Sequence, residues 1–369
     1  MAVPFFDIKR QISSIRNEID TAISEVIDNG AFILGPKVKE LEDFAAKYIG
    51  AKHAIGVASG TDALMLALKA LNIKKDAEVI TTPFTFVATL DAIEFCGATP
   101  VFVDIDPDTF NIDTKKIEAA ITKKTEVILP VHLYGQPANM EEMLSIAKKY
   151  NLKVVEDAAQ AIGAKYNNKY VGSLGEVGCF SFFPTKNLGC FGDGGLVTTN
   201  SDEIAKMLRI LKGHGSTITY HYDFVGHNSR LDSIQAAILL IRFKYLEEWT
   251  NKRRENAKLY KELLKDIKEI SLPKEDPKIF HVYNQFTIKV EARNELLDFL
   301  KSKNIGCAIY YPLSLHLQNA FKSLGFKNGD FPISEKTQES VISLPIFPEL
   351  TREEIEEVVD GIKKFYGKS

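Results

Sequence analysis

The sequence has few of the features that mark metal sites, disulfide frameworks or membrane segments. Its four cysteines, Cys96, Cys179, Cys190 and Cys307, lie far apart without a C-x-x-C pair, so we expect free, buried thiols and no metal site. No apolar run approaches the roughly 20 residues of a membrane helix, and Pro4 interrupts any apolar core of a secretory signal. These absences predict a cytoplasmic protein.

Charge of one sign is also lacking. The 46 basic and 49 acidic residues leave a formal net charge of −3, which provides no electrostatic surface for nucleic acid or an anionic membrane. The sequence contains no internal repeat and no low-complexity tract. With 369 residues, of which 45% are apolar, the chain is long enough for two domains. We therefore expect a protein that acts on a small molecule.

From about residue 50 to 200, short β-rich runs alternate with amphipathic stretches, a pattern typical of an α/β fold with a mostly parallel sheet. The expected strands are Glu78–Thr82, Val101–Asp104, Val127–Val131, Lys153–Glu156, Gly178–Phe182 and Leu196–Thr199. The expected helices between them include Thr61–Leu71, Thr89–Cys96 and Met140–Tyr150. The first 45 or so residues indicate a helix with a capping arm.

The remainder predicts a smaller α+β domain after a helical stretch, Leu231–Leu264, and a proline-punctuated linker, Leu272–Lys278. Its expected strands are Gln285–Val290 and Cys307–Tyr311, and its expected helices are Asn294–Lys303 and Arg352–Tyr366. We place the large domain at residues 1–250 and the small domain at 251–369.

A single lysine, Lys186, lies in a glycine-rich segment, SFFPTKNLGCFGDGG, between two expected strands. A lysine on such a loop can be partly desolvated, which lowers its pKa and leaves a nucleophilic amine. The alternative is an exposed lysine on a flexible loop. A second candidate is Asp157, at the end of the apolar run Val154–Glu156, which either faces a ligand or caps a helix. The adjacent Glu156 is interpreted as structural.

Two further segments open expected helices. Ser59, Gly60 and Thr61 open a helix, whose free N–H groups could hold a phosphate, although S-G-T is also an ordinary cap. Phe86, in TPFTFVAT, could stack on a planar ring or belong to the core.

Together these motifs resemble the DegT/DnrJ/EryC1/StrS family of sugar aminotransferases, which are fold-type I enzymes that use pyridoxal 5'-phosphate (PLP). The resemblance covers essentially the whole chain and includes ASGTDAL, VFVDID, PVHLYGQ, VVEDAAQAIGA and GHNSRLDSIQAA. It implies that Lys186 holds the cofactor as an imine and moves protons, and that Asp157 pairs with the pyridine nitrogen. The other implied cofactor contacts are Gln160, Phe86, Gly60, Thr61, Ser181 and, from a neighbouring subunit, Asn228. The family also has a dehydratase branch with histidine in place of the lysine, so Lys186 favours transamination.

The resemblance further implies a homodimer with shared active sites, a UDP- or dTDP-linked keto-sugar that is aminated at C3, and L-glutamate as amino donor. Candidate substrate contacts are His214, Arg230, Tyr310, Tyr311 and His316. Arg230 could instead form a salt bridge with Asp232 or another acidic residue. The alternative functions are a PLP- or sugar-binding regulatory protein without catalysis and a dinucleotide-dependent oxidoreductase. The second is disfavoured because no G-x-G-x-x-G turn follows the first strand.

Overall fold

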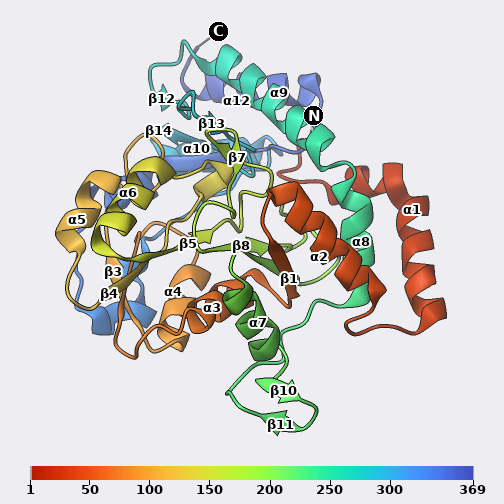
Figure 1. The fold of residues 1–369 in the computed structure, drawn as a ribbon. Coiled ribbons are helices and arrows are strands. Elements are labelled where there is room, and N and C mark those ends of the chain that lie inside the picture. Colours follow the sequence, from red (N-terminus) through yellow and green to blue (C-terminus); the bar gives the residue numbers. More distant parts are fainter. Residues whose placement is uncertain (1, 369) are drawn as a thin grey trace.

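A computed structural model describes residues 2–368. Its centre is a seven-stranded sheet (Figure 1) in the order β1-β9-β8-β5-β4-β2-β3. β9 runs antiparallel to β1 and β8, and the other neighbours are parallel. The strands are β1 (His53–Val57), β2 (Glu78–Thr81), β3 (Thr99–Phe102), β4 (Thr125–Ile128), β5 (Lys153–Asp157), β8 (Val177–Ser181) and β9 (Gly195–Thr199).

Helices cover both faces of this sheet because alternate strand residues point to opposite sides. Ile55, Cys179 and Val197 pack in one buried cluster with α3 (Gly60–Ala70), α4 (Ala88–Phe95) and α7 (Asp202–Leu211). Their neighbours Ala54, Phe180 and Leu196 pack on the other side with α2 (Pro36–Ile49) and α8 (Ser233–Phe243). α6 (Met140–Tyr150) lies against β5, and α1 (Ile8–Asn29) lies against α8.

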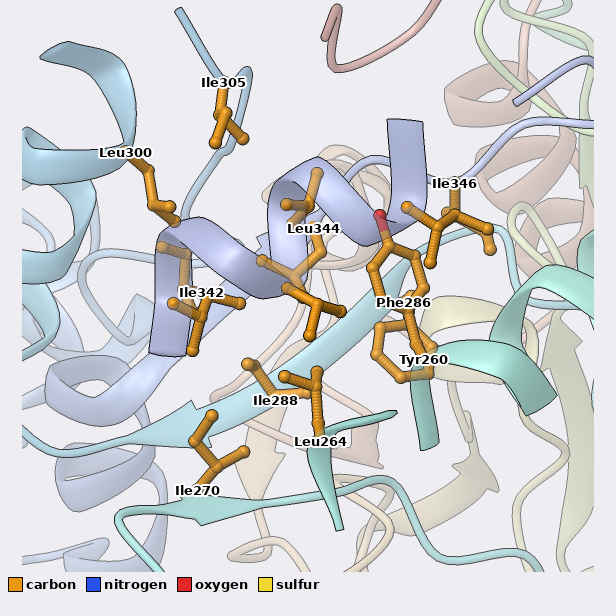
Figure 2. Close-up of a cluster of buried hydrophobic side chains, with 14 of the residues drawn as sticks. Tyr260, Leu264, Ile270, Phe286, Ile288, Leu300, Ile305, Ile342, Leu344 and Ile346 are labelled. Atoms are coloured by element: carbon orange, nitrogen blue, oxygen red, sulfur yellow. The ribbon is translucent and has the colours of Figure 1, made fainter. Parts of the chain in front are cut away.

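The C-terminal part forms a smaller α+β unit with its own core (Figure 2). A three-stranded sheet, ordered β12-β14-β15, packs with α9 (Leu246–Leu264), α10 (Arg293–Ser302) and α12 (Arg352–Phe365). Within it, the ring of Tyr260 stacks on Phe286 with a centroid distance of 5.0 Å. The strands are β12 (Ile270–Ser271), β14 (Phe286–Val290) and β15 (Val341–Leu344).

The remaining elements are short. They are α5 (Ile117–Ala120), α11 (Pro332–Ser340), the strands β6 (Lys165–Tyr166), β7 (Lys169–Tyr170), β13 (Ile279–Phe280), β10 (Ser216–Ile218) and β11 (His221–Tyr222), and 3-10 turns at Thr114–Lys116, Leu133–Gly135, Leu315–Leu317 and Asn319–Leu324. Across residues 2–368, none of the helices combines the length and the apolar character needed to span a bilayer.

Four sequence predictions differ from the structure. Cys307–Tyr311 is not a strand, since only Ala308 bridges to Ser343, and the third strand of the small sheet is the buried run β15. The predicted helix over Leu231–Leu264 is two helices, because α8 packs on α1 and α2 whereas α9 packs on α12. The N-terminal region contains two helices, α1 and α2, and β1 was not expected. The other predicted strands and helices are present with small shifts of their ends.

Candidate active site

The motif residues gather at one edge of the large sheet. β1, β2, β5 and β8 all point the same way, so the segments that follow them meet at their carboxyl ends. Asp157 and Ser181 end β5 and β8, and Lys186 lies in the connection between β8 and β9. Gly60 and Thr61 follow β1, and Phe86 follows β2.

The turn after β1 opens helix α3 and leaves N–H groups that an anion could contact. Ser59 caps α3, and its Oγ accepts the N–H of Asp62 at 3.1 Å, while the carbonyl of Ser59 accepts the N–H of Ala63. The N–H groups of Gly60 and Thr61, in the first helical turn, have no acceptor earlier in the helix. A Cβ on Gly60 would lie 2.7 Å from the Cβ of Ser181, so only glycine lets this turn approach β8 so closely.

Asp157 is buried and held by two hydrogen bonds. Oγ1 of Thr89 donates to its Oδ2 at 2.9 Å, and the N–H of Ala159 donates to its Oδ1 at 3.2 Å. Burial raises the pKa of Asp157, and these two donors together with the positive charge of Lys186 partly oppose that rise. Asp157 ends a strand and is not the N-cap of an α-helix, so the ligand-facing interpretation fits the structure better than the helix-cap alternative.

The neighbouring Glu156 points to the other side of the sheet. Its carboxylate accepts the N–H groups of Gly172, Leu174 and Gly175 at 2.7–2.8 Å, and it lies 3.1 Å from Nε2 of His132. Because Nδ1 of His132 accepts the N–H of Ala138, the imidazole proton is on Nε2 and points at Glu156. Glu156 therefore fixes the turn before β8, as expected of a structural residue.

Lys186 is half-buried, and surrounding protein removes enough water to lower its pKa to about 8, although the charge of Asp157 opposes this shift. The loop around it is firmly held. Nδ2 of the next residue, Asn187, donates to the carbonyl of Val282 at 3.0 Å, and the N–H of Cys190 donates to the carbonyl of Phe182 at 2.8 Å. The alternative of a freely exposed lysine does not describe this side chain.

Gln160, Phe86 and Tyr311 form a third group in the site. Oε1 of Gln160 accepts the N–H of Tyr134 at 2.6 Å, and its Nε2 donates to the hydroxyl of Tyr311 at 3.1 Å. The Tyr311 ring lies 6.2 Å from that of Phe86. Phe86 keeps 55% of its surface exposed, so it is not the core residue that the alternative proposed.

The other predicted contacts lie further out. His214 and Asn228 are exposed at the base of the β10–β11 hairpin, where Gly213 bridges to Asn228. Arg230 is half-buried, and the ion pairs found within residues 2–368 do not include one between it and Asp232. The buried Oγ of Ser229 accepts the N–H of Ala58, which ties this segment to the turn after β1.

His316 does not reach a surface that a ligand could contact. Its side chain is fully buried, Nε2 lies 3.0 Å from Glu335, and its ring packs against Phe102 and Phe331. His316 is therefore not proposed as a substrate contact. Within residues 2–368, no three His, Cys, Asp or Glu side chains are grouped so as to hold a metal ion.

A helix-opening turn, a buried carboxylate and a partly desolvated amine thus lie at one edge of the sheet. The sequence profile of the DegT/DnrJ/EryC1/StrS aminotransferase family matches residues 13–363. The chain belongs to this family. It is therefore an aminotransferase, and its cofactor is PLP.

Several named relatives are similar to this chain over almost its whole length. A "pleiotropic regulatory protein" of Geobacillus stearothermophilus is 50% identical over 99% of both chains. A UDP-N-acetyl-3-dehydro-alpha-D-glucosamine 3-aminotransferase of Acidithiobacillus ferrooxidans is 46% identical over 98% of both. Among solved structures, DesV of S. venezuelae, in complex with a ketimine intermediate, superposes with a TM-score of 0.97 at 41% identity over 100% of this chain and 99% of DesV. This aminotransferase family member thus has the predicted fold-type I architecture.

Sequence reasoning missed three residues that support the candidate site of this chain: Thr89, Tyr134 and Ser229. They orient Asp157, Gln160 and the turn after β1. Thr89 and Tyr134 lie in motifs quoted for the resemblance, TPFTFVAT and PVHLYGQ, but their contacts cross between strands. The only available signal was a hydroxyl in a segment that follows a strand.

Proposed function

We propose that this chain transfers an amino group to a nucleotide-linked keto-sugar, with Lys186 as the catalytic residue. The observation that supports this most is the pKa of about 8 at Lys186, beside the buried carboxylate of Asp157. An amine with this pKa is neutral in an appreciable fraction of molecules near neutral pH, so it can act as a nucleophile and as a base.

The residues present fit PLP. In the proposed arrangement Gly60, Thr61 and Ser181 hold the phosphate, Phe86 stacks on the ring, and Gln160 contacts the ring hydroxyl. Asp157 pairs with the pyridine nitrogen, held in place by Thr89. When bound, the cofactor supplies an electron sink for the carbon that carries the amino group.

The proton transfers are assigned to Lys186. Its neutral Nζ would take the proton from the α-carbon of the amino donor and would deliver a proton to the sugar carbon that receives nitrogen. We propose that the sugar or its diphosphate contacts Arg230, Tyr310 and Tyr311. His214, which is exposed, is proposed to contact the substrate at the edge of the site. A guanidinium suits phosphate oxygens, and tyrosine rings suit sugar faces.

We propose C3 as the position aminated and L-glutamate as the donor. Several relatives support C3, including the 46% identical enzyme above and a dTDP-3-amino-3,6-dideoxy-alpha-D-galactopyranose transaminase of Aneurinibacillus thermoaerophilus at 45% identity. The names of these two relatives include one UDP-linked and one dTDP-linked sugar. The assay below therefore uses both nucleotides. We also propose domain limits of 1–250 and 251–369.

The test is a two-step assay on the PLP-loaded protein. L-Glutamate alone should shift the visible absorption of the bound cofactor to the near-ultraviolet and release 2-oxoglutarate. A 3-keto UDP-acetamido sugar or a 3-keto dTDP-6-deoxy sugar should then restore the original spectrum and yield an amino sugar. A spectrum unchanged by glutamate and by other amino acids would contradict an aminotransferase.

One observation supports the regulatory alternative: the Geobacillus stearothermophilus relative is called a pleiotropic regulatory protein. A regulatory protein that only bound PLP or sugar would not need the lowered pKa of Lys186. A Lys186→Ala chain that kept its full effect in cells would favour regulation.

We propose a homodimer because two exposed apolar segments lie near Asn228. The β10–β11 hairpin projects from the body of the protein (Figure 1). Tyr220 in its turn is 85% exposed, and Val225, just after it, is 88% exposed. Residues 32–34, Phe-Ile-Leu, are also exposed, and Ile33 bridges to Asp232. Such apolar surface is typical of an interface, and we assign a second copy of this chain to it.

Subunit mixing tests whether Asn228 serves the partner's site. Lys186→Met and Asn228→Asp proteins should each be inactive alone, the second because an added carboxylate repels the cofactor phosphate. After subunit exchange, mixed dimers should regain activity, because one of their two sites combines an intact Lys186 with an intact Asn228. Exchange without recovered activity would show that Asn228 acts within its own subunit, and a monomer by light scattering would overturn the dimer itself.

A further inference from the structure

The first residues of the chain are fixed against the small domain. Val3 is buried and pairs with Ile305, with hydrogen bonds from its N–H to the carbonyl of Asn304 at 3.0 Å and from the N–H of Gly306 to its carbonyl at 2.7 Å. A Cβ at Gly306 would lie 2.3 Å from the backbone nitrogen of Phe5, so a side chain there would displace the segment. Phe5 is thus placed by backbone contacts.

The same segment is held at its other end. Asp7 caps α1 by accepting the N–H of Lys9 at 3.0 Å. Three residues later, Arg10 donates two hydrogen bonds, at 2.8 and 2.7 Å, to the carboxylate of Glu354 on α12. A bidentate arginine pair is geometrically specific, so Phe5 lies between two fixed points.

Phe5 is the outer end of a row of four aromatic rings, the aromatic row, made of Phe5, Tyr310, Tyr311 and Phe86. Successive ring centroids are 6.1, 5.8 and 6.2 Å apart. All four side chains are partly or largely exposed. Since Phe86 is at the proposed cofactor position, the row runs from the cofactor outward to the N-terminal segment.

The Tyr311 side chain and the backbone of Tyr310 are also anchored. Nε2 of Gln160 donates to the hydroxyl of Tyr311 at 3.1 Å, and the hydroxyl of Tyr134 donates to the carbonyl of Tyr310. The aromatic row is therefore formed before any ligand arrives. Preformed ring surfaces bind with a smaller loss of side-chain entropy than mobile ones.

We propose that Phe5 contacts the substrate and helps to determine its specificity, by stacking against a ring of the nucleotide-linked sugar. This rests on the proposed function, which supplies the substrate class. A ligand whose reacting sugar carbon lies at the cofactor must extend outward. The four rings are spaced from the proposed cofactor position to Phe5, with successive rings inclined by 36°, 73° and 42°. Aromatic faces bind sugar rings and nucleobases alike.

Calorimetric titration of the PLP-loaded protein tests the proposal with four probes: UDP, dTDP, UDP-N-acetylglucosamine and dTDP-glucose. We expect Phe5→Ala to weaken binding of at least one probe about tenfold and Phe5→Trp to restore it to within about twofold. The control is Phe95→Ala, which removes an equally large side chain, 67% exposed, from the end of α4. It should leave binding unchanged.

The pattern over the probes separates the two rings. If Phe5→Ala weakens UDP or dTDP, the residue stacks on the base, whereas a loss seen only with the sugar-linked probes places it against the sugar. Equal affinity of Phe5→Ala and wild type for every probe would overturn the assignment. So would a loss matched by an equal slowing of the glutamate reaction, since that indicates structural damage.

Failure of the proposed function has a different signature. If wild-type protein does not react with any amino donor, the aminotransferase proposal fails regardless of Phe5. If wild type reacts but binds none of the four probes, the nucleotide-sugar substrate is wrong, and the assignment of Phe5 falls with it.

Discussion

Replacing Lys186 by methionine is expected to lower the rate of amino-group transfer by about 10⁴-fold or more, since the amine is assigned both the nucleophilic and the proton-transfer role. Methionine keeps an unbranched chain of similar length, so the loop anchored by Asn187 and Cys190 should stay in place. The measurement is 2-oxoglutarate release from L-glutamate in a single turnover. Substantial turnover by this variant would assign the proton transfers to another group.

The same variant is expected to be more stable than wild type when both lack cofactor. The pKa of Lys186 is about 8 in the folded chain against 10.5 for an unperturbed lysine, so folding disfavours the proton. This costs up to about 3 kcal/mol at pH 7. The cost disappears as the pH rises from about 8 to 10.5, because the lysine of the unfolded chain then also loses its proton and both states are neutral.

Urea unfolding of the two apoproteins at pH 7 and pH 10 measures this difference. The advantage of Lys186→Met should be larger at pH 7 and should shrink at pH 10. Lys153→Met is the matched control, because Lys153 is exposed at the start of β5. An advantage of the same size at both pH values would show that the lysine is not desolvated.

Replacing Asp157 by asparagine is expected to reduce kcat by about 10² to 10³-fold, the range for loss of one preorganised electrostatic contact. The amide keeps the size of the carboxylate and can still meet Thr89, but it carries no charge to hold a proton on the pyridine nitrogen. The measurement is the single-turnover rate with saturating cofactor, which separates catalysis from cofactor affinity.

Glu156→Gln is the matched control, since it makes the same chemical change one residue away on the opposite side of the strand. It should lower the melting temperature by several degrees, because the turn at Gly172–Gly175 loses charge-assisted hydrogen bonds worth about 1.5–3 kcal/mol each, and should keep most of the activity. If both variants lost activity equally, the effect at Asp157 would reflect folding and not charge.

The residues at the centre of the site were predictable because each lies in a local pattern. Asp157 ends a continuous apolar run, and Lys186 stands alone among glycines between two runs, so strand periodicity places both at one sheet edge. The family resemblance then supplied roles that the pattern alone left open. The contact between Gly60 and Ser181 was not predictable, since it depends on how two distant strands pack.

The errors arose where local propensity and tertiary packing disagree. Cys307–Tyr311 has strong β propensity, yet the buried run Val341–Leu344 pairs with β14 in its place. Nothing between Phe243 and Leu246 is a glycine or proline, so no local signal marks the end of α8. β1 contains Gly56, which weakens a strand pattern but leaves room for Leu231. His316 was listed as a substrate contact because its segment resembles one that faces the substrate in relatives, and that resemblance does not reveal that its side chain is buried.

The antiparallel strand β9 has a consequence for the order of assembly. β1 joins the sheet only through β9, where His53 pairs with Thr199 across most of the large domain's sequence. The turn after β1, which we propose to hold the cofactor phosphate, therefore reaches Ser181 only when this long-range pairing is complete, and closing so long a loop is a slow event in folding. On this proposal, cofactor binding reports a completed sheet, and a newly synthesised chain in which β9 has not yet paired does not bind the cofactor.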